Sequence, residues 1–142
     1  MQIALISANF SKEPEPVFPL GCAYLISAIK KAGHDVSFID LLFLEGGVES
    51  LKRKLLDLKP DVVALSVRNL ETIDYPESKS YVSDLSEVIK GIKSAVDVPI
   101  IVGGGGFSVA SESFLKKIGG DIGIVGEGEE ILLKIAMEIE GG

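Results

Sequence analysis

The most informative segment of this chain is VPIIVGGGGFSVAS, from Val98 to Ser111. It opens with an apolar run to Val102 that lacks polar alternation, which is typical of a strand buried on both faces of a parallel sheet. Four consecutive glycines, Gly103 to Gly106, follow this run. Because glycine has no Cβ atom, a bulky ligand can approach the main chain there within contact distance. The stretch therefore predicts a core strand that ends in a floor for a ligand.

Two other interpretations of the glycine run are weaker. A tight strand-to-helix turn needs only one or two glycines. A dinucleotide fingerprint needs Gly-x-Gly-x-x-Gly after the first strand of the fold. Here Ser108 and Val109 stand where the third glycine would be, and the strand is the fourth in the chain. We therefore interpret the glycine run as the floor of a ligand-binding site.

Composition limits the class of protein. With 142 residues, 46% of them hydrophobic, the chain is long enough for one domain that needs no covalent staples. The single cysteine excludes an internal disulfide, so a reducing cytoplasm is expected. A net charge of −7 leaves no basic face for nucleic acid, and no apolar run approaches the roughly 18–20 residues of a membrane span. Nucleic acid, a membrane and a targeting peptide are not expected.

Apolar runs alternate along the chain with segments of helical periodicity. The expected strands are Ile3–Ser7, Asp35–Leu42, Asp61–Ser66, Val98–Val102 and Asp121–Val125. The expected helices are Leu20–Lys31, a segment that carries Leu51, Leu55 and Leu58 before Pro60, Tyr81–Val96, Phe107–Ile118 and Glu130–Glu140. This alternation predicts a single α/β domain over residues 1–142. Its architecture is a flavodoxin-like (Rossmann-like), doubly wound, five-stranded parallel sheet in the order 2-1-3-4-5.

Two strand-to-helix connections are long. About ten residues follow the first strand and about a dozen follow the third, whereas such loops usually have roughly 2–6 residues. In sheets of this kind, ligands bind beyond the carboxyl ends of the strands where the strand order reverses. We therefore expect a site at this edge, between the first and third strands.

Four segments meet at that edge: Asn9–Gly21, Ser66–Asp74, Gly103–Phe107 and Gly126–Glu129. Prolines stiffen the first segment into a rigid cover. The second places a hydroxyl, a guanidinium and an amide directly after a buried strand, where side chains often serve a ligand. The last places carboxylates at a helix N-terminus, where they can cap the helix or touch a ligand.

Few residues suggest catalysis. His34, the only histidine, is expected to be a surface turn residue at the opposite edge, and Cys22 a small core residue in the first turn of a helix. No zinc ligand set, Ser-His-Asp set or Walker loop can be assembled from the sequence. No catalytic or metal-ligating residue is therefore expected.

Four segments together resemble a known family. They are FPLGCAYLISAIKKAGHDVSFIDL (18–41), KPDVVALSV (59–67), VPIIVGGGG (98–106) and DIGIVGEGEE (121–130). The combination resembles the N-terminal cobalamin-binding domain of cobalamin-dependent radical S-adenosylmethionine enzymes, a group that includes methyltransferases and anaerobic ring cyclases. The resemblance covers nearly the whole chain, and its most specific parts are the Pro-Leu-Gly helix start and the Gly-Glu-Gly-Glu segment.

The resemblance implies that cobalamin lies across the carboxyl edge, with its nucleotide tail between the sheet and the neighbouring helices. Ser66 matches the serine after the third strand, and Gly103 and Gly104 match a glycine pair beside the tail. A branched side chain at Gly104 is expected to block the tail while the domain stays folded. The implied cobalamin-binding residues are Pro19, Leu20, Gly21, Ser66, Val67, Arg68, Asn69, Gly103, Gly104, Gly105, Gly106, Phe107, Gly126, Glu127 and Gly128.

Two departures from the family refine this expectation. The Asp-x-His-x-x-Gly motif that supplies a histidine to cobalt in related proteins is absent after the first strand, so base-off cobalamin without a histidine lower ligand is expected. Gly105 and Gly106 stand where radical relatives often have Pro-His. With no histidine, Arg68 is expected to face the corrin and discourage axial ligation, or else to pair with Glu71 or Asp74 on the surface.

The family's catalytic half is not in this sequence. Its Cys-x-x-x-Cys-x-x-Cys motif holds a [4Fe-4S] cluster, which one cysteine cannot do. The resemblance thus implies a binding module, with the cluster and S-adenosylmethionine in a downstream radical domain of the same polypeptide. An FMN-binding module or a receiver-type signalling module is the alternative. A receiver needs an aspartate where Ser66, Val67 and Arg68 stand, and an FMN site needs a hydroxyl-rich first loop, for which Ser7 and Ser11 are slight evidence.

Overall fold

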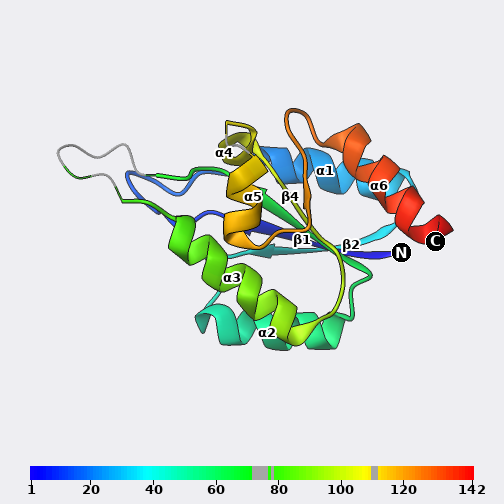
Figure 1. Ribbon diagram of the computed structural model, residues 1–142, viewed down its shortest axis with the longest axis horizontal. Coiled ribbons are helices and arrows are strands. Elements are labelled where there is room, and N and C mark those ends of the chain that lie inside the picture. The colour runs from blue at the N-terminus through cyan, green and yellow to red at the C-terminus, as the bar shows by residue number, and fades with distance from the viewer. Residues whose placement is uncertain (72–76, 78, 110–111) are drawn as a thin grey trace.

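The computed structural model describes residues 1–71, 77, 79–109 and 112–142, and it contains a parallel sheet covered on both faces by helices (Figure 1). The sheet has five strands in the order β2-β1-β3-β4-β5, and every neighbouring pair is parallel. The predicted fold class and strand order are therefore confirmed.

The central strands are almost entirely buried. The strands are β1 (Gln2–Ala8), β2 (Asp35–Asp40), β3 (Val62–Val67), β4 (Ile100–Gly103) and β5 (Ile122–Gly123). The last of these is shorter than predicted, because β5 is an edge strand that pairs only with β4 and only through two residues. The second strand ends at Asp40, whose carboxylate accepts a hydrogen bond from the Leu42 amide at 3.0 Å and starts a turn.

The helices are α1 (Leu20–Lys31), α2 (Gly47–Leu58), α3 (Val82–Ala95), α4 (Gly105–Ser108), α5 (Glu112–Ile118) and α6 (Glu129–Gly141). The prediction of one continuous helix over Phe107–Ile118 is wrong. The Ser108 hydroxyl donates to the Gly104 carbonyl at 3.1 Å and accepts from the Gly126 amide at 3.0 Å, which ties the end of α4 to the loop before α6. Helix α4 therefore ends at Ser108, and helix α5 begins four residues later, at Glu112.

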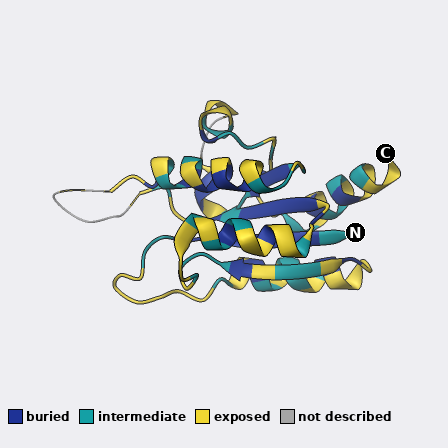
Figure 2. Cartoon of the chain, turned by 90° about the horizontal axis from the view of Figure 1, so that it is seen from below, coloured by how far each residue is buried: buried dark blue, intermediate teal, exposed yellow. Residues whose placement is uncertain are grey.

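The helices divide between the two faces of the sheet (Figure 1). Successive strand residues point to opposite faces, so Ala4 and Ile6 join one core while Ile3 and Leu5 join the other. The first core includes residues of α2, α3 and α5, and the second includes residues of α1 and α6. Figure 2 shows buried strands at the centre and helices whose exposed residues face outward. We call these the α2/α3 face and the α1/α6 face.

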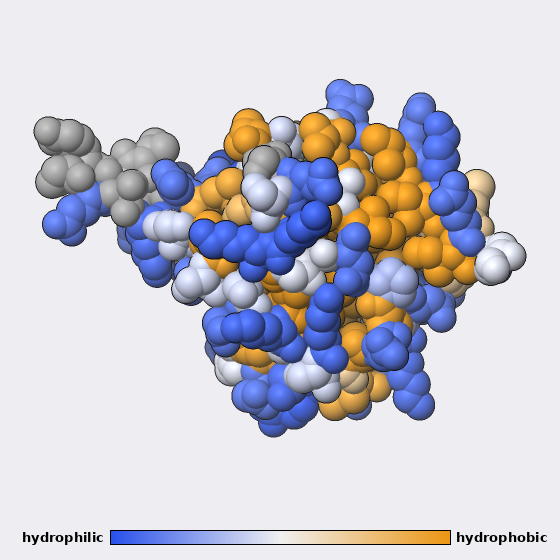
Figure 3. Space-filling model, viewed as in Figure 1, coloured by the Kyte–Doolittle hydropathy of each residue, from blue (hydrophilic) through white to orange (hydrophobic). Residues whose placement is uncertain are grey.

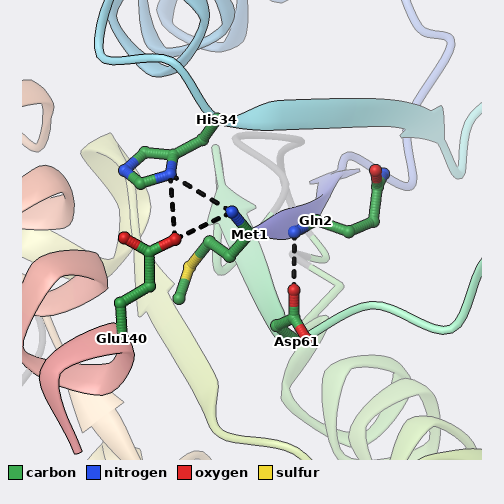
Figure 4. Close-up of polar contacts among 5 residues, drawn as sticks. All are labelled: Met1, Gln2, His34, Asp61 and Glu140. Atoms are coloured by element: carbon green, nitrogen blue, oxygen red, sulfur yellow. Dashed lines mark hydrogen bonds and ion pairs between the residues drawn. The ribbon is translucent and has the colours of Figure 1, made fainter.

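The amino edge of the sheet is closed by a cluster of charged groups (Figure 4). The Met1 ammonium donates to Glu140 Oε1 at 2.9 Å, and His34 Nδ1 lies 3.4 Å from the Met1 nitrogen and 3.5 Å from Glu140 Oε1. The hydrogen bond with the ammonium lowers the pKa of Glu140 and raises the pKa of the amino terminus. His34 is only 8% exposed, so the prediction of a surface residue is wrong, because the start of β1 and the end of α6 cover its turn.

Within the described part of the chain, every helix is too short or too polar to cross a bilayer.

Candidate functional site

A cavity of about 1010 Å³ lies at the carboxyl edge of the sheet, on the α1/α6 face. The ends of β3 and β4 form its floor, α1 forms one side, and α6 with the loop before it forms the other. Figure 3 shows apolar side chains at the molecular surface over α6, where Ile131 and Met137 are 40% and 59% exposed. Apolar side chains therefore reach the molecular surface beside this wide cavity.

The deep part of the cavity is aliphatic. We call its buried and half-buried hydrocarbon side chains the inner wall, which consists of Leu25, Ala64, Ile101, Ile124 and Leu132. At the rim stand three carboxylates, of which Glu127 and Glu130 are exposed and Glu129 is half-buried. None of the described residues that line the cavity is basic. A ligand would thus place its apolar part inside and keep its anionic groups away from the rim.

The glycine run serves both the fold and the cavity. Gly104 has a φ of +101°, and a Cβ atom there would lie 2.5 Å from the Val67 carbonyl oxygen. A Cβ atom at Gly106 would likewise lie 2.7 Å from the Arg68 carbonyl oxygen. At Gly105, which lines the cavity, a Cβ atom would meet nothing within 4 Å. The fold itself requires glycine at 104, so a valine there tests folding rather than binding, contrary to the expectation from sequence.

Eight of the predicted site residues come together in the cavity lining: Gly21, Ser66, Gly103, Gly104, Gly105, Gly126, Glu127 and Gly128. Seven do not line it. Pro19 and Leu20 precede the lining part of α1, and Val67, Gly106 and Phe107 are buried beneath it. Arg68 and Asn69 are exposed beyond the end of β3.

Of the predicted residues outside the cavity lining, Phe107 is buried in the core and Arg68 is exposed to solvent. The Phe107 ring packs on the α2/α3 face, with its centroid 6.3 Å from that of Phe114. Arg68 makes no ion pair with a described residue, including Glu71, while Asp74 lies outside the described residues. Its guanidinium is therefore exposed at the carboxyl edge without a described carboxylate partner.

Sequence reasoning missed the inner wall and also Tyr24, Ser108 and Ile131. Apolar helix and strand residues were assigned to the core by their periodicity, which does not distinguish a packed wall from an open one. One signal could have been read: Leu25 lies four residues after Gly21, so the two share a helix face.

The cavity lies over β3 and β4, one strand away from the predicted crevice between β1 and β3. Cys22, which is 2% exposed, fills that crevice from the first turn of α1. Burial raises the pKa of its thiol, while hydrogen bonds with the Ser66 and Ser7 hydroxyls act in the opposite direction. Ser7 and Ser66 are paired across β1 and β3, so one thiol covers both. The prediction of a small core residue at Cys22 is confirmed.

The fold and the cavity define a ligand-binding domain of the doubly wound α/β class, with its site at the carboxyl edge. A family model described as the B12 binding domain matches residues 7–136. The chain belongs to this family, and cobalamin is its cofactor.

Relatives support the same assignment. Tryptophan 2-C-methyltransferase of Streptomyces laurentii is 26% identical over 141 residues, which are 99% of this chain and 23% of that protein. The radical S-adenosylmethionine methyltransferase TsrM of Kitasatospora setae, solved with cobalamin and a [4Fe-4S] cluster bound, is 28% identical with a TM-score of 0.91 over 99% of this chain and 25% of its own. The resemblance to radical enzymes is confirmed.

The cobalamin-dependent radical enzyme OxsB, solved with aqua-cobalamin and S-adenosylmethionine bound, shares the fold with a TM-score of 0.79. It is 21% identical, and the match covers 99% of this chain and 19% of that one. The chain thus spans about a quarter or less of the length of the relatives that it matches.

Proposed function

We propose that this chain is the cobalamin-binding module of a radical S-adenosylmethionine methyltransferase. In this proposal it holds cobalamin base-off, with the benzimidazole tail in the cavity between α1 and α6. The observation that carries the proposal is the cavity itself, which combines an open glycine at 105 with an aliphatic inner wall. A flat aromatic base buries its faces favourably against such a wall. When bound, cobalamin supplies a cobalt centre that accepts and releases methyl groups.

The position of the only histidine supports a cobalt without a histidine lower ligand. His34 lies at the amino edge, beside Met1 and Glu140, whereas the cavity opens at the carboxyl edge. Reaching cobalt would require His34 to leave its buried place and cross the sheet. The imidazole of this chain is therefore not available to the cofactor.

Arg68 and Asn69 extend from the carboxyl end of β3, beside the glycine run, and we include them in the proposal as cover for the lower face of the corrin. The close approach of the Arg68 main chain to Gly106 ties this position to the run. Arginine keeps its proton and is a poor metal ligand. A guanidinium there would disfavour a sixth ligand on cobalt rather than provide one.

The remaining chemistry is assigned to the rest of a longer polypeptide in the cytoplasm. The relatives are about four times as long as this chain, and their names describe methyltransferases, which favours methyl transfer over ring cyclisation. A downstream radical domain would hold the [4Fe-4S] cluster and S-adenosylmethionine. Anaerobic reconstitution of this chain alone with iron and sulfide should give no stoichiometric cluster, because it has one cysteine.

The alternative modules receive no support from the site. The phosphate of FMN would meet the carboxylates of Glu127, Glu129 and Glu130 with no basic side chain among the described lining residues. A receiver needs an acidic cluster that binds a cation, and the described residues contain no such group of three or more. Neither alternative is proposed further.

A titration tests the proposal. The chain is titrated with hydroxocobalamin and followed by absorbance, then the complex is reduced and examined by electron paramagnetic resonance. We expect one cobalamin per chain and a cobalt(II) signal without nitrogen splitting from the benzimidazole. FMN serves as the control ligand and should not bind. A base-on signal would contradict the base-off geometry, and absence of cobalamin binding would contradict the function.

A further inference from the structure

The chemistry of the inner wall limits which part of a ligand can bind against it. Ile101, Ile124 and Leu132 are 2–4% exposed, and they line the cavity with methyl and methylene groups alone. Leu25 adds another hydrocarbon side chain from α1. None of these side chains can donate or accept a hydrogen bond. Any polar atom of a ligand that lies against them loses its bonds to water without a replacement from the wall.

The polar side chains of the cavity are placed elsewhere or are already occupied. The glutamates stand at the rim, and Tyr24 is 59% exposed at the mouth. The Ser108 hydroxyl already donates to Gly104 and accepts from Gly126. Ser66 shares a hydrogen bond with the buried Cys22 thiol at the end of β3. The side chains of the interior therefore offer few hydrogen bonds to a base with several polar edges.

We infer that this cavity selects among cobamides by the chemistry of their lower base. The inference rests on the proposed function and adds the class of base to it. Dimethylbenzimidazole and cresol present mainly hydrocarbon edges, so they suit the inner wall. Adenine adds an exocyclic amine and further ring nitrogens, which would be buried unpaired. Unpaired buried polar groups weaken binding by about tenfold or more, so purine cobamides should be poor ligands.

The test compares affinities of the wild-type chain for cobalamin, cresolyl cobamide, adeninyl cobamide and cobinamide, which has no base. We expect cobalamin and cresolyl cobamide to bind within a few-fold of each other, and adeninyl cobamide at least about tenfold more weakly. Equal affinities for cobalamin and adeninyl cobamide would overturn the inference. Cobinamide binding as tightly as cobalamin would also overturn it, while leaving cobalamin binding intact. Binding of no cobamide at all would overturn the proposed function as well.

A substitution in the wall gives a second, independent readout. Leu25→Gln places an amide beside the base at a half-buried position, so it should narrow the preference for cobalamin over adeninyl cobamide several-fold. The matched control is Leu56→Gln, the same change on α2, where Leu56 is 53% exposed and far from the cavity lining. An unchanged preference in a folded Leu25→Gln variant would contradict the inference. If that variant does not fold, the wild-type comparison still decides.

Discussion

Glycine residues have different structural roles on the two faces of the sheet. On the α2/α3 face, Gly91 is buried in α3, and a Cβ atom there would collide with Val48 Cγ1 of α2. On the α1/α6 face, Gly21 and Gly105 line the cavity, and a Cβ atom at either would meet nothing within 4 Å. The first glycine lets two helices pack closely, while the other two keep space open. Substitutions at these glycines should therefore separate effects on stability from effects on ligand binding.

Adding a side chain to the cavity at Gly105 should have the largest effect, which is a loss of cobalamin affinity. Gly105→Val is expected to lower cobalamin affinity by at least about a hundredfold, because its methyl groups would occupy the cavity floor, which corresponds to roughly 3 kcal/mol. The unfolding free energy should change by less than about 1 kcal/mol, since a Cβ atom at Gly105 would meet nothing within 4 Å. Absorbance titration and urea denaturation measure the two quantities. The cobalamin affinity of Gly105→Ala should fall between those of Gly105→Val and wild type. Unchanged affinity in both variants would show that cobalamin does not contact the chain at Gly105.

Adding a side chain at Gly91, between α2 and α3, should lower stability and leave cobalamin affinity nearly unchanged. Gly91→Val is expected to lower the unfolding free energy by about 1–3 kcal/mol, because a side chain must be forced between α2 and α3. Cobalamin affinity of the folded protein should stay within about twofold, since Gly91 does not line the cavity. Urea denaturation and titration again separate the effects. A loss of affinity as large as that of Gly105→Val would erase the distinction between the faces.

The amino edge should contribute a smaller, pH-dependent amount. The carboxyl group of Glu140 has a lowered pKa in the folded protein, so its contribution to stability exists above its unfolded pKa and is lost as the pH falls through the folded value. The Met1 ammonium has a raised pKa, so its contribution is lost as the pH rises through that raised value. Glu140→Gln should therefore be slightly less stable than wild type near neutral pH and equal to it in acid. A constant difference down to acidic pH would contradict this assignment.

The effect expected at Arg68 is small and mainly spectroscopic. Arg68→Ala should leave the cobalamin affinity within about threefold, because the side chain is exposed and does not line the cavity. The cobalt(II) paramagnetic resonance spectrum should nevertheless show increased axial water coordination if the guanidinium covers the lower face. Arg53→Ala, the same change at an exposed position of α2, is the matched control. Identical spectra for wild type and Arg68→Ala would assign Arg68 to the surface alone.

Most of the fold could be predicted because its signals are local. Apolar runs such as Asp61–Ser66 and the helical spacing of Leu51 and Leu55 recur at short range, and Gly33 and Pro60 mark where helices end. The alternation of strands and helices predicts a doubly wound parallel sheet, for which 2-1-3-4-5 is one of two common strand orders. The division of α4 from α5 could not be predicted, since it depends on a hydrogen bond between Ser108 and Gly126, eighteen residues away.

The site could be predicted only in part, for a similar reason. The glycines at 103 to 105 are visible because the run is longer than a turn needs, and Ser66 is visible because it ends a buried apolar strand. Leu132 and Ile124 look like ordinary core residues in sequence, and only the spacing of α1 from α6 exposes them to a cavity. The burial of His34 likewise depends on Glu140, more than a hundred residues later.

The exposed position of Tyr24 gives the protein a built-in optical reporter. The chain has no tryptophan and three tyrosines, so its ultraviolet emission comes from tyrosine. Tyr24 stands in the cavity lining, whereas Tyr81 is 4% exposed beside Phe10, with ring centroids 5.6 Å apart. A corrin bound at the carboxyl edge, with its tail in the cavity, would absorb energy from Tyr24 and quench its emission. Loading can thus be followed at low protein concentration without any label, and Tyr24→Phe would reduce that signal.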